Sequence, residues 1–299
     1  MPLRFGVLLI PERPVHELLG WATRFDEAGV DSLWVAEHLA LPQNLDHPWY
    51  AGWDLLAAMA GVTADCRIGP LVTTFQYHSS LAMARHIVTV DAFSEGRLDL
   101  GVGTGGAPVD RSFAGIPDAS LGALAERLER GLTETRALLE GDRLAVPPAP
   151  ELVRPGPADI ALSTPSPQLG KVPIVVGGHG SRSLDVAAKH ANRWNTYGTR
   201  PGTEDVFEVL RRQCGQLSDR CVAIGRKPDD ITGSVLLDFN PQLSPTSASE
   251  LADVARRLYE LGFEECIAYA WLDGVVTRSA DELLSFVVDT LPSLSAACN

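Results

Sequence analysis

Residues 172–190, Val-Pro-Ile-Val-Val-Gly-Gly-His-Gly-Ser-Arg-Ser-Leu-Asp-Val-Ala-Ala-Lys-His, are the clearest guide to the fold. The apolar run Val172–Val176 is short and nearly continuous, as in a parallel strand that is buried on both faces. Glycines follow it directly, and the apolar spacing of Ser181–His190 then predicts a helix. A buried strand, a glycine turn and a helix in this order predict one βα unit of a parallel α/β fold.

The same unit can be followed along the whole chain. Eight apolar segments are predicted as strands: Arg4–Ile10, Ser32–Ala36, Arg67–Thr73, Arg97–Val102, Val172–Val176, Arg193–Thr196, Ile231–Leu237 and Cys266–Ala270. Amphipathic segments predict a helix after each strand: His16–Ala28, Trp53–Ala64, Leu81–Ser94, Leu121–Glu140, Ser181–His190, Glu204–Val222, Ser249–Leu261 and a last helix that contains Leu283–Leu291. Eight βα units in roughly 250 residues are typical of a TIM (β/α)8 barrel. We therefore predict a single barrel domain over residues 1–299, with a doubly wound parallel sheet as the alternative.

The alternation is interrupted between the fourth and fifth units. Residues 142–171 contain the prolines Pro147, Pro148, Pro150, Pro155, Pro157, Pro165 and Pro167. Because proline lacks an amide hydrogen and fixes φ, this insertion is expected to be neither a regular helix nor a central strand. We predict a lid or a long loop that shapes the substrate pocket together with the shorter loop Leu41–Tyr50.

Composition and charge exclude several classes of function. The chain has 299 residues, with 38 acidic against 25 basic side chains and a formal net charge of −13. Nucleic-acid binding is not expected, because neutralising phosphates requires Lys and Arg. No apolar run approaches the roughly 18 residues of a membrane span. Five scattered cysteines without a CxxC spacing are typical of a reducing compartment. We expect a cytoplasmic protein with no membrane partner and no metal site.

Barrel enzymes carry their active sites at the C-terminal ends of the strands, and this rule selects the candidate residues. The fifth strand ends in a glycine turn that enters a helix directly, where free amide groups and the positive end of the helix dipole form an anion site. Ser181 is expected to cap the helix and Arg182 to pair with a phosphate. The predicted phosphate site consists of Gly177, Gly178, His179, Gly180, Ser181 and Arg182. A plain tight turn with an N-cap is the alternative.

A second glycine-rich strand end, Gly101–Gly106, formally matches the GxGxxG pattern of dinucleotide-binding folds. That interpretation requires a helix immediately after the turn, whereas Pro108 and a polar stretch precede the predicted helix at Leu121. We favour the hypothesis that glycine here lets a planar ligand approach the backbone closely.

Glu37 and His38 follow the second strand and are the best candidates for proton transfer. Histidine titrates near neutral pH, and a neighbouring carboxylate can tune its pKa. A structural histidine at a strand end is the alternative. His78, His86 and His190 fall within or before predicted helices and are given no role. The sequence has no HExxH, GxSxG or Walker A pattern, so a serine hydrolase has no support.

Four segments together resemble the bacterial luciferase-like family of flavin- and deazaflavin-dependent oxidoreductases. In chain order they are residues 31–38 (DSLWVAEH), 84–97 (ARHI at the start, DAFSEGR at the end), 98–105 (LDLGVGTG) and 173–195 (PIVVGG at the start, ANRWN at the end). Each segment is weak alone, but their succession over most of the chain is specific.

The resemblance implies a TIM barrel that binds coenzyme F420 or FMN at the C-terminal face of the strands. It makes the turn Gly177–Ser181 the phosphate site and places Glu37 and His38 beside the reactive edge of the ring. The ring contacts that it implies are Gly69, Pro70 and Leu71 at a bulge in strand three, and Gly103 and Thr104 at the end of strand four. That bulge often holds a cis peptide bond in the family, and Pro70 would lower the cost of one here.

One position departs from the family pattern. The sugar-phosphate dehydrogenases of the family carry a glutamate proton donor after the Gly-Thr-Gly sequence, where this chain has Gly106, so a glucose-6-phosphate type of activity is not expected. The likeness favours coenzyme F420 and hydride transfer to or from a small organic substrate, with His38 as proton donor or acceptor. An FMN-dependent monooxygenase and a non-catalytic flavin-binding homologue are the alternatives. Because related barrels often pair through helices, a homodimer is expected.

Overall fold

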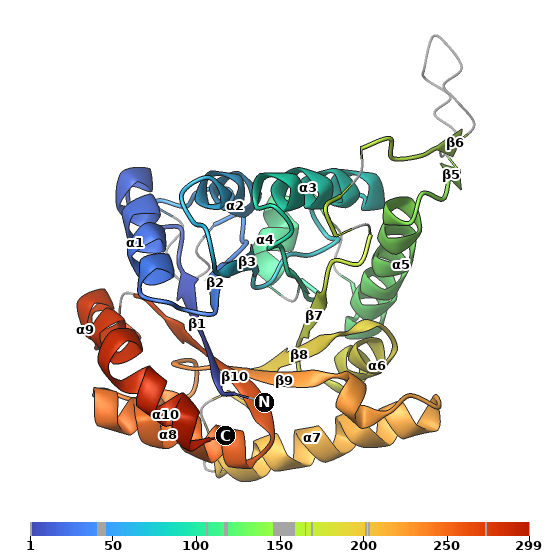
Figure 1. Cartoon of the computed structure of the whole chain (residues 1–299). Helices are drawn as coiled ribbons and strands as arrows, with labels where there is room; N and C mark the ends of the chain where they lie inside the picture. The colour runs from blue at the N-terminus through green and yellow to red at the C-terminus, as the bar shows by residue number, and fades with distance from the viewer. Residues whose placement is uncertain are drawn as a thin grey trace.

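Parallel strands form the centre of the molecule and helices cover them on the outside (Figure 1). The computed structural model describes residues 2–40, 46–105, 107–116, 119–145, 159–164, 166–168, 170–200, 202, 204–272 and 274–298. Within these ranges, none of the helices is both long and apolar enough to span a bilayer.

Eight strands make the central sheet, in the spatial order β3-β2-β1-β10-β9-β8-β7-β4. They are β1 (Arg4–Leu9), β2 (Ser32–Val35), β3 (Arg67–Pro70), β4 (Leu100–Val102), β7 (Ile174–Gly177), β8 (Arg193–Thr196), β9 (Thr232–Leu236) and β10 (Phe263–Tyr269). Every ladder between them is parallel, and β1 lies between β2 and the last strand, β10. The predicted TIM barrel is confirmed, and with it the near-continuous apolar strands that are buried on both faces.

The helices follow the strands as the sequence predicts, with one addition. They are α1 (Val15–Glu27), α2 (Gly52–Ala60), α3 (Ser80–Phe93), α4 (Pro108–Phe113), α5 (Leu121–Leu139), α6 (Ser181–His190), α7 (Val206–Ala223), α8 (Ala248–Glu260), α9 (Ala280–Ser285) and α10 (Leu291–Ala297). A π-helical turn, Phe286–Thr290, joins α9 to α10. The addition is α4, a short helix that begins at Pro108, the residue that we took as a break; proline is well suited to the first turn of a helix.

Trp34 fills the interior of the barrel and is fully buried. A Cβ atom placed on Gly6 would lie 3.0 Å from its Nε1 atom, and one on Gly69 would lie 2.9 Å from its Cζ3 atom. Glycine on the neighbouring strands therefore makes the space that this large ring occupies.

The barrel closes between β3 and β4 through a bulge instead of a regular ladder. Isolated bridges join Ile68 to Leu98 and Thr73 to Val102, so the β3 side has one more residue between the bridges than the β4 side. The predicted bulge is therefore present. The cis peptide bond lies between Leu71 and Val72, not before Pro70. Pro70 is still in the regular parallel ladder with Val35, which requires an extended trans backbone.

The described part of the proline-rich insertion lies at the opposite end of the barrel from the one that we predicted. It leaves the end of α5 as β5 (Leu144–Ala145), which pairs with β6 (Asp159–Ile160) in an antiparallel ribbon that projects outwards in Figure 1. Gln168 donates a hydrogen bond to the carbonyl oxygen of Leu98 at 2.8 Å, just before β4. A segment that follows a helix and precedes a strand returns to the N-terminal ends of the strands, so the described part of the insertion does not shape a pocket at the C-terminal face. Residues 146–158 lie outside the described ranges.

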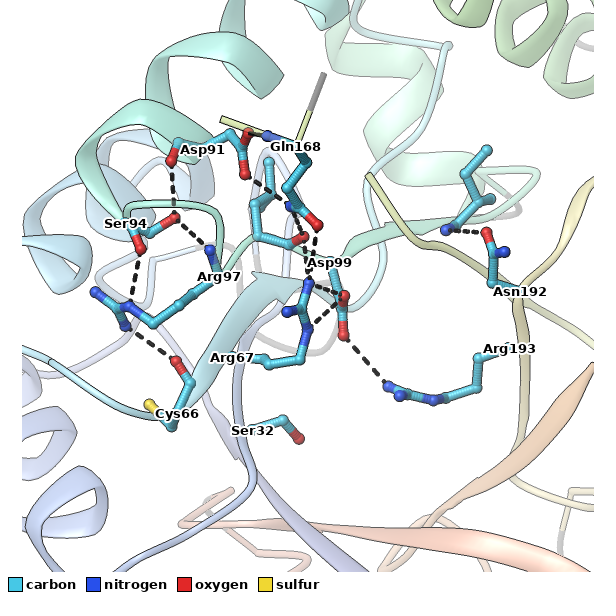
Figure 2. A network of polar contacts seen from close by, with 12 residues as sticks. Ser32, Cys66, Arg67, Asp91, Ser94, Arg97, Asp99, Gln168, Asn192 and Arg193 are labelled. Atoms are coloured by element: carbon cyan, nitrogen blue, oxygen red, sulfur yellow. Dashed lines mark hydrogen bonds and ion pairs between the residues drawn. The ribbon is translucent and has the colours of Figure 1, made fainter. Parts of the chain in front are cut away.

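A network of buried ion pairs closes the N-terminal end of the barrel (Figure 2). Asp99 accepts a hydrogen bond from Arg67 Nε at 2.7 Å and pairs with Arg193 at 3.4 Å. Arg193 also pairs with the fully buried Glu265 at 3.1 Å, and Glu265 accepts a hydrogen bond from Ser32 Oγ at 2.7 Å. Residues from four strands and from the turn before β4 are thus tied together by charge, which is favourable only while every member keeps its partner.

We predict that Asp99→Ala lowers the free energy of unfolding by about 3 kcal/mol, because it leaves two partly buried arginines without their shared, fully buried carboxylate. Urea denaturation monitored by circular dichroism measures this loss. Arg143→Ala, which breaks the exposed pair with Asp159 in the insertion, is the control and should leave the urea midpoint unchanged. Equal effects of the two substitutions would contradict the prediction.

Candidate functional site

The C-terminal strand ends come together on one face of the barrel, opposite the ion-pair network. This face gathers Glu37 and His38 after β2, Thr73 and Thr74 after β3, the Gly-Thr-Gly sequence after β4 and the glycine turn after β7. All of the predicted site residues except Gly69 follow a strand end or form one. Gly106 lies outside the described residues, so its predicted effect is not examined by the structure.

Glu37 is held by two donors in a mostly buried position. Its Oε1 atom is 2.9 Å from His78 Nε2, and its Oε2 atom accepts a hydrogen bond from Thr73 Oγ1 at 2.5 Å. Only 10% of the Glu37 side chain and 15% of the His78 side chain are exposed. His78 is therefore part of the site, although we gave it no role. Its position shortly after the third strand was the signal that could have identified it, since that strand end also faces the site.

A second histidine lies behind this pair. The ring of His86 stacks on Trp53 at a centroid distance of 5.2 Å and stands edge-on to His78 at 5.2 Å. Burial lowers the pKa of His86, and the neighbouring His78 lowers it further. His86 is consequently neutral at physiological pH and supports the position of His78.

His38 is paired with a buried carboxylate from α4. Its Nδ1 atom is 2.5 Å from Asp110 Oδ2, while the amide of Leu39 donates to Asp110 Oδ1 at 3.0 Å. Burial favours a raised pKa for Asp110, but hydrogen bonds from His38, Tyr77 and the Leu39 amide outweigh it and hold the pKa below its usual value. Asp110 is therefore ionised and accepts the hydrogen bond from His38, which assigns the proton of that bond to Nδ1. Among the described residues, His38 Nε2 has no hydrogen-bond partner.

The glycine turn after β7 has the backbone arrangement of an anion site, but its side chains differ from the prediction. Gly180, and not Ser181, is the N-cap of α6, and no side chain caps the helix. Ser181 instead accepts a hydrogen bond from Arg220 at 2.8 Å. Arg182 is exposed and its nearest carboxylate is Glu126, at 3.8 Å, so it extends toward α5. The free amides of the first helical turn are the donors that the turn offers to an anion.

His179 adds a buried polar atom to this turn. Its Nδ1 atom is buried and has no hydrogen-bond partner among the described residues. The ring stands edge-on to Tyr197 at a centroid distance of 4.7 Å. Burial, with a smaller contribution from Arg200, lowers the pKa of His179. A neutral imidazole with an unsatisfied nitrogen beside uncapped amides is suited to bind a ligand.

Glycine residues at two strand ends make room for the side chain of Val72. A Cβ atom on Gly103 would lie 2.7 Å from Val72 Cγ2, and one on Gly177 would lie 2.9 Å from Val72 Cγ1. We call these two glycines, which pack against Val72, the glycine floor; Gly177 also begins the turn that carries the unpaired His179 Nδ1 atom. We did not predict that Val72 belongs to this part of the site, because the predicted bulge ended at Leu71. Gly69 and Pro70 lie in the irregular pairing between β3 and β4, which we call the β3–β4 seam. Their role as ring contacts stays a prediction.

Comparison with known proteins identifies the family of this chain. The model of the family described as luciferase-like monooxygenase matches residues 2–232. The chain belongs to this family. The predicted Leu41–Tyr50 loop also reaches the C-terminal face of the barrel at its described end. The Trp49 ring there stands edge-on to His38 at a centroid distance of 5.8 Å.

Two curated relatives illustrate the range of the family. The chain is 32% identical over 155 residues to 4-hydroxyprotoasukamycin monooxygenase of Streptomyces nodosus subsp. asukaensis, a match that covers 47% of this chain and 38% of that protein. It is 28% identical over 242 residues to an F420-dependent glucose-6-phosphate dehydrogenase of Microbacterium testaceum (strain StLB037), which covers 77% of this chain and 66% of that protein. Both F420-dependent and oxygenating enzymes are thus relatives at low identity.

A solved structure shows the same fold. The chain superposes on an F420-dependent secondary alcohol dehydrogenase in complex with an F420–acetone adduct with a TM-score of 0.79 and 15% identity, over 100% of both chains. At this identity the likeness concerns the fold alone.

We predict that Asp110→Asn destabilises the protein at neutral pH by about 2 kcal/mol, because a charged acceptor of three hydrogen bonds becomes a neutral amide. The folded-state pKa of Asp110 lies below its unfolded value of 3.8, so its contribution is fully present above that value and is lost as the pH falls through the folded pKa. The difference in the free energy of unfolding between variant and wild type should therefore become smaller below about pH 4.

Urea denaturation at a series of pH values measures this difference. Asp219→Asn, a change on the exposed face of α7, is the control and should follow the wild type at each pH. If Asp110→Asn differs from the wild type by the same free energy of unfolding at pH 7 and below pH 4, the carboxylate charge contributes nothing to stability.

Proposed function

We propose that this protein is an F420-dependent oxidoreductase that transfers a hydride between the deazaflavin and a small organic substrate. The observation that carries the proposal is the His38–Asp110 pair, a histidine with an assigned tautomer and an open second nitrogen, on the same face as the glycine floor. The F420-dependent relative supports it, because its match extends over 77% of this chain, against 47% for the monooxygenase.

The chain supplies binding and orientation in this proposal. Gly103 and Gly177 over Val72 would receive the ring, and the uncapped amides of α6 with His179 would hold its phosphate. When bound, F420 supplies two-electron hydride chemistry, which the side chains of the site cannot provide. The residues therefore need only position the substrate, exclude water and move a proton.

His38 is proposed as the residue that moves this proton. Asp110 holds the Nδ1 hydrogen, so a proton can be taken up or released only at Nε2. Glu37, which already accepts hydrogen bonds from Thr73 and pairs with His78, is proposed to set the charge beside the reactive edge of the ring.

An FMN-dependent monooxygenase is the second candidate, and the 32% identity to the Streptomyces monooxygenase is the observation that favours it. A non-catalytic flavin-binding homologue is a third hypothesis that is excluded by any substrate-dependent oxidation or reduction of the cofactor. Homodimer formation and a cytoplasmic location stay predictions.

Two parallel fluorescence titrations of the purified protein, one with F420 and one with FMN, distinguish the cofactors. We expect F420 to bind with a micromolar or lower Kd and FMN to bind at least tenfold more weakly. The reverse preference would contradict the proposal and favour the monooxygenase, for which oxygen consumption with a supply of reduced flavin is the next assay.

We predict that His38→Ala lowers kcat by about 10²–10⁴, because it removes the group that exchanges the proton. The Kd of the cofactor should change little, since the glycine floor and the α6 amides stay in place. Steady-state kinetics with a substrate found by screening alcohols, imines and activated alkenes measures the effect. His16→Ala, on the exposed face of α1, is the matched control. An unchanged kcat for His38→Ala would remove His38 from the mechanism.

A further inference from the structure

The last part of the segment between β2 and α2 is fastened to the end of β1. We call this part, residues 46–50, the strap. Its two anchors are consecutive residues that follow β1. The amide of Tyr50 donates a hydrogen bond to the carbonyl oxygen of Pro11 at 2.9 Å, and His47 Nε2 lies 3.1 Å from Glu12 Oε2. Since β1 and β2 are neighbours in the sheet, the strap joins the ends of two adjacent strands.

Burial of Glu12 gives the second anchor its importance. Only 3% of the Glu12 side chain is exposed, against 24% of the His47 side chain. A buried carboxylate is costly unless polar or charged groups compensate it. His47 brings such a group from the strap, so detaching the strap would remove a partner from a buried charge. The contact between Glu12 and His47 therefore favours the attached strap.

Trp49 lies between the two anchors in the chain and contacts His38. The two rings stand edge-on, with a centroid distance of 5.8 Å and an interplanar angle of 67°. The indole Nε1 atom is buried and has no hydrogen-bond partner within the described part of the chain. The position of this ring thus depends on packing and on the anchors on either side of it, and not on a hydrogen bond of its own.

His38 is consequently held by two contacts of different kinds. Asp110 holds its Nδ1 atom at 2.5 Å, and the Trp49 ring packs against the imidazole. The His38 side chain is still 37% exposed, so a ligand or a reagent can reach it. A group that moves a proton has to be kept in one orientation by the residues around it.

We propose that Glu12 and His47 are positioning residues for His38. Their contact keeps the strap in place and the Trp49 ring against the imidazole, which limits both the rotation of His38 and the access of water to it. The inference deepens the proposed function, and its catalytic part rests on that function. The attachment of the strap does not depend on a cofactor, so the first experiment uses none.

Carbethoxylation of the whole protein with diethyl pyrocarbonate, followed at each histidine by peptide mass mapping, tests the attachment. The reagent modifies accessible imidazole nitrogens, so its initial rate at His38 reports how well the strap covers that ring. We expect His47→Ala to raise this rate by about threefold or more, because the strap opens more often without its anchor. Trp49→Ala should raise it as well.

Three further variants separate the contact from general damage to the fold. The double variant Glu12→Gln/His47→Ala removes the pair without leaving a buried charge, and it should act as His47→Ala does. His47→Gln keeps a side-chain N–H group that can donate to Glu12, so it should keep the wild-type rate at His38. His16→Ala, on the exposed face of α1, is the control and should also keep that rate.

Three outcomes of the modification experiment would overturn the proposal. The first is an unchanged rate at His38 in both His47→Ala and the double variant. The second is an equal rise in His47→Gln and His47→Ala, since the contact with Glu12 would then not hold the strap. The third is an unchanged rate in Trp49→Ala, which would show that this ring does not cover His38.

Steady-state kinetics then test the catalytic part. We expect His47→Ala to lower kcat by about tenfold, because His38 loses its fixed orientation, and His47→Gln to restore it. The KM and the Kd of the cofactor should change little, since the glycine floor and the α6 amides stay in place. A faster modification of His38 with an unchanged kcat would contradict a positioning role. If F420 does not bind at all, the proposed function fails, while the modification rates still decide whether Glu12 and His47 hold Trp49 against His38.

Discussion

The close approach of two backbones at the β3–β4 seam is the constraint on which the rest of the site depends. A Cβ atom on Gly69 would lie 2.1 Å from the Asp99 carbonyl oxygen, and one on Gly101 would lie 2.0 Å from the Pro70 carbonyl oxygen. Only glycine permits this contact around the buried Trp34 ring. The extra residue on the β3 side then brings Val72 under the glycine floor and Thr73 to the Glu37 carboxylate. A packing requirement inside the barrel thus determines the shape of the face above it.

The two ends of the barrel use charge in different ways. At the N-terminal end, Asp99 and Glu265 are paired with arginines, which is a structural arrangement. At the C-terminal end, Asp110 accepts several hydrogen bonds, and one ring nitrogen of its donor His38 has no partner within the described ranges. Buried carboxylates therefore stabilise the fold at one end and orient a titratable group at the other. In TIM barrels the N-terminal face of the strands serves stability and the C-terminal face carries the active site, and the two ends of this barrel follow that pattern.

The candidate site was only partly visible in the sequence. Glu37 and His38 could be selected because they follow a strand, and the barrel collects all C-terminal strand ends on one face. Their partners could not, since His78 is 41 residues from Glu37 and Asp110 is 72 residues from His38 along the chain. The helix that carries Asp110 begins at a proline that we interpreted as a break. Nothing in local spacing shows which acid meets which histidine, because that depends on loop paths across the barrel.

The sequence by itself determined the fold class and the identity of the strand ends. Short apolar runs, amphipathic helices and glycine turns are local patterns, and eight repetitions of one βα unit leave little choice of architecture. Only the tertiary structure decided that the cis bond follows Leu71, that Gly180 caps α6 and that the proline-rich insertion meets Asp91 at the N-terminal end. These features depend on the register of the β3–β4 seam and on contacts between distant segments. Such contacts arise when the barrel closes, and no window of sequence contains both partners.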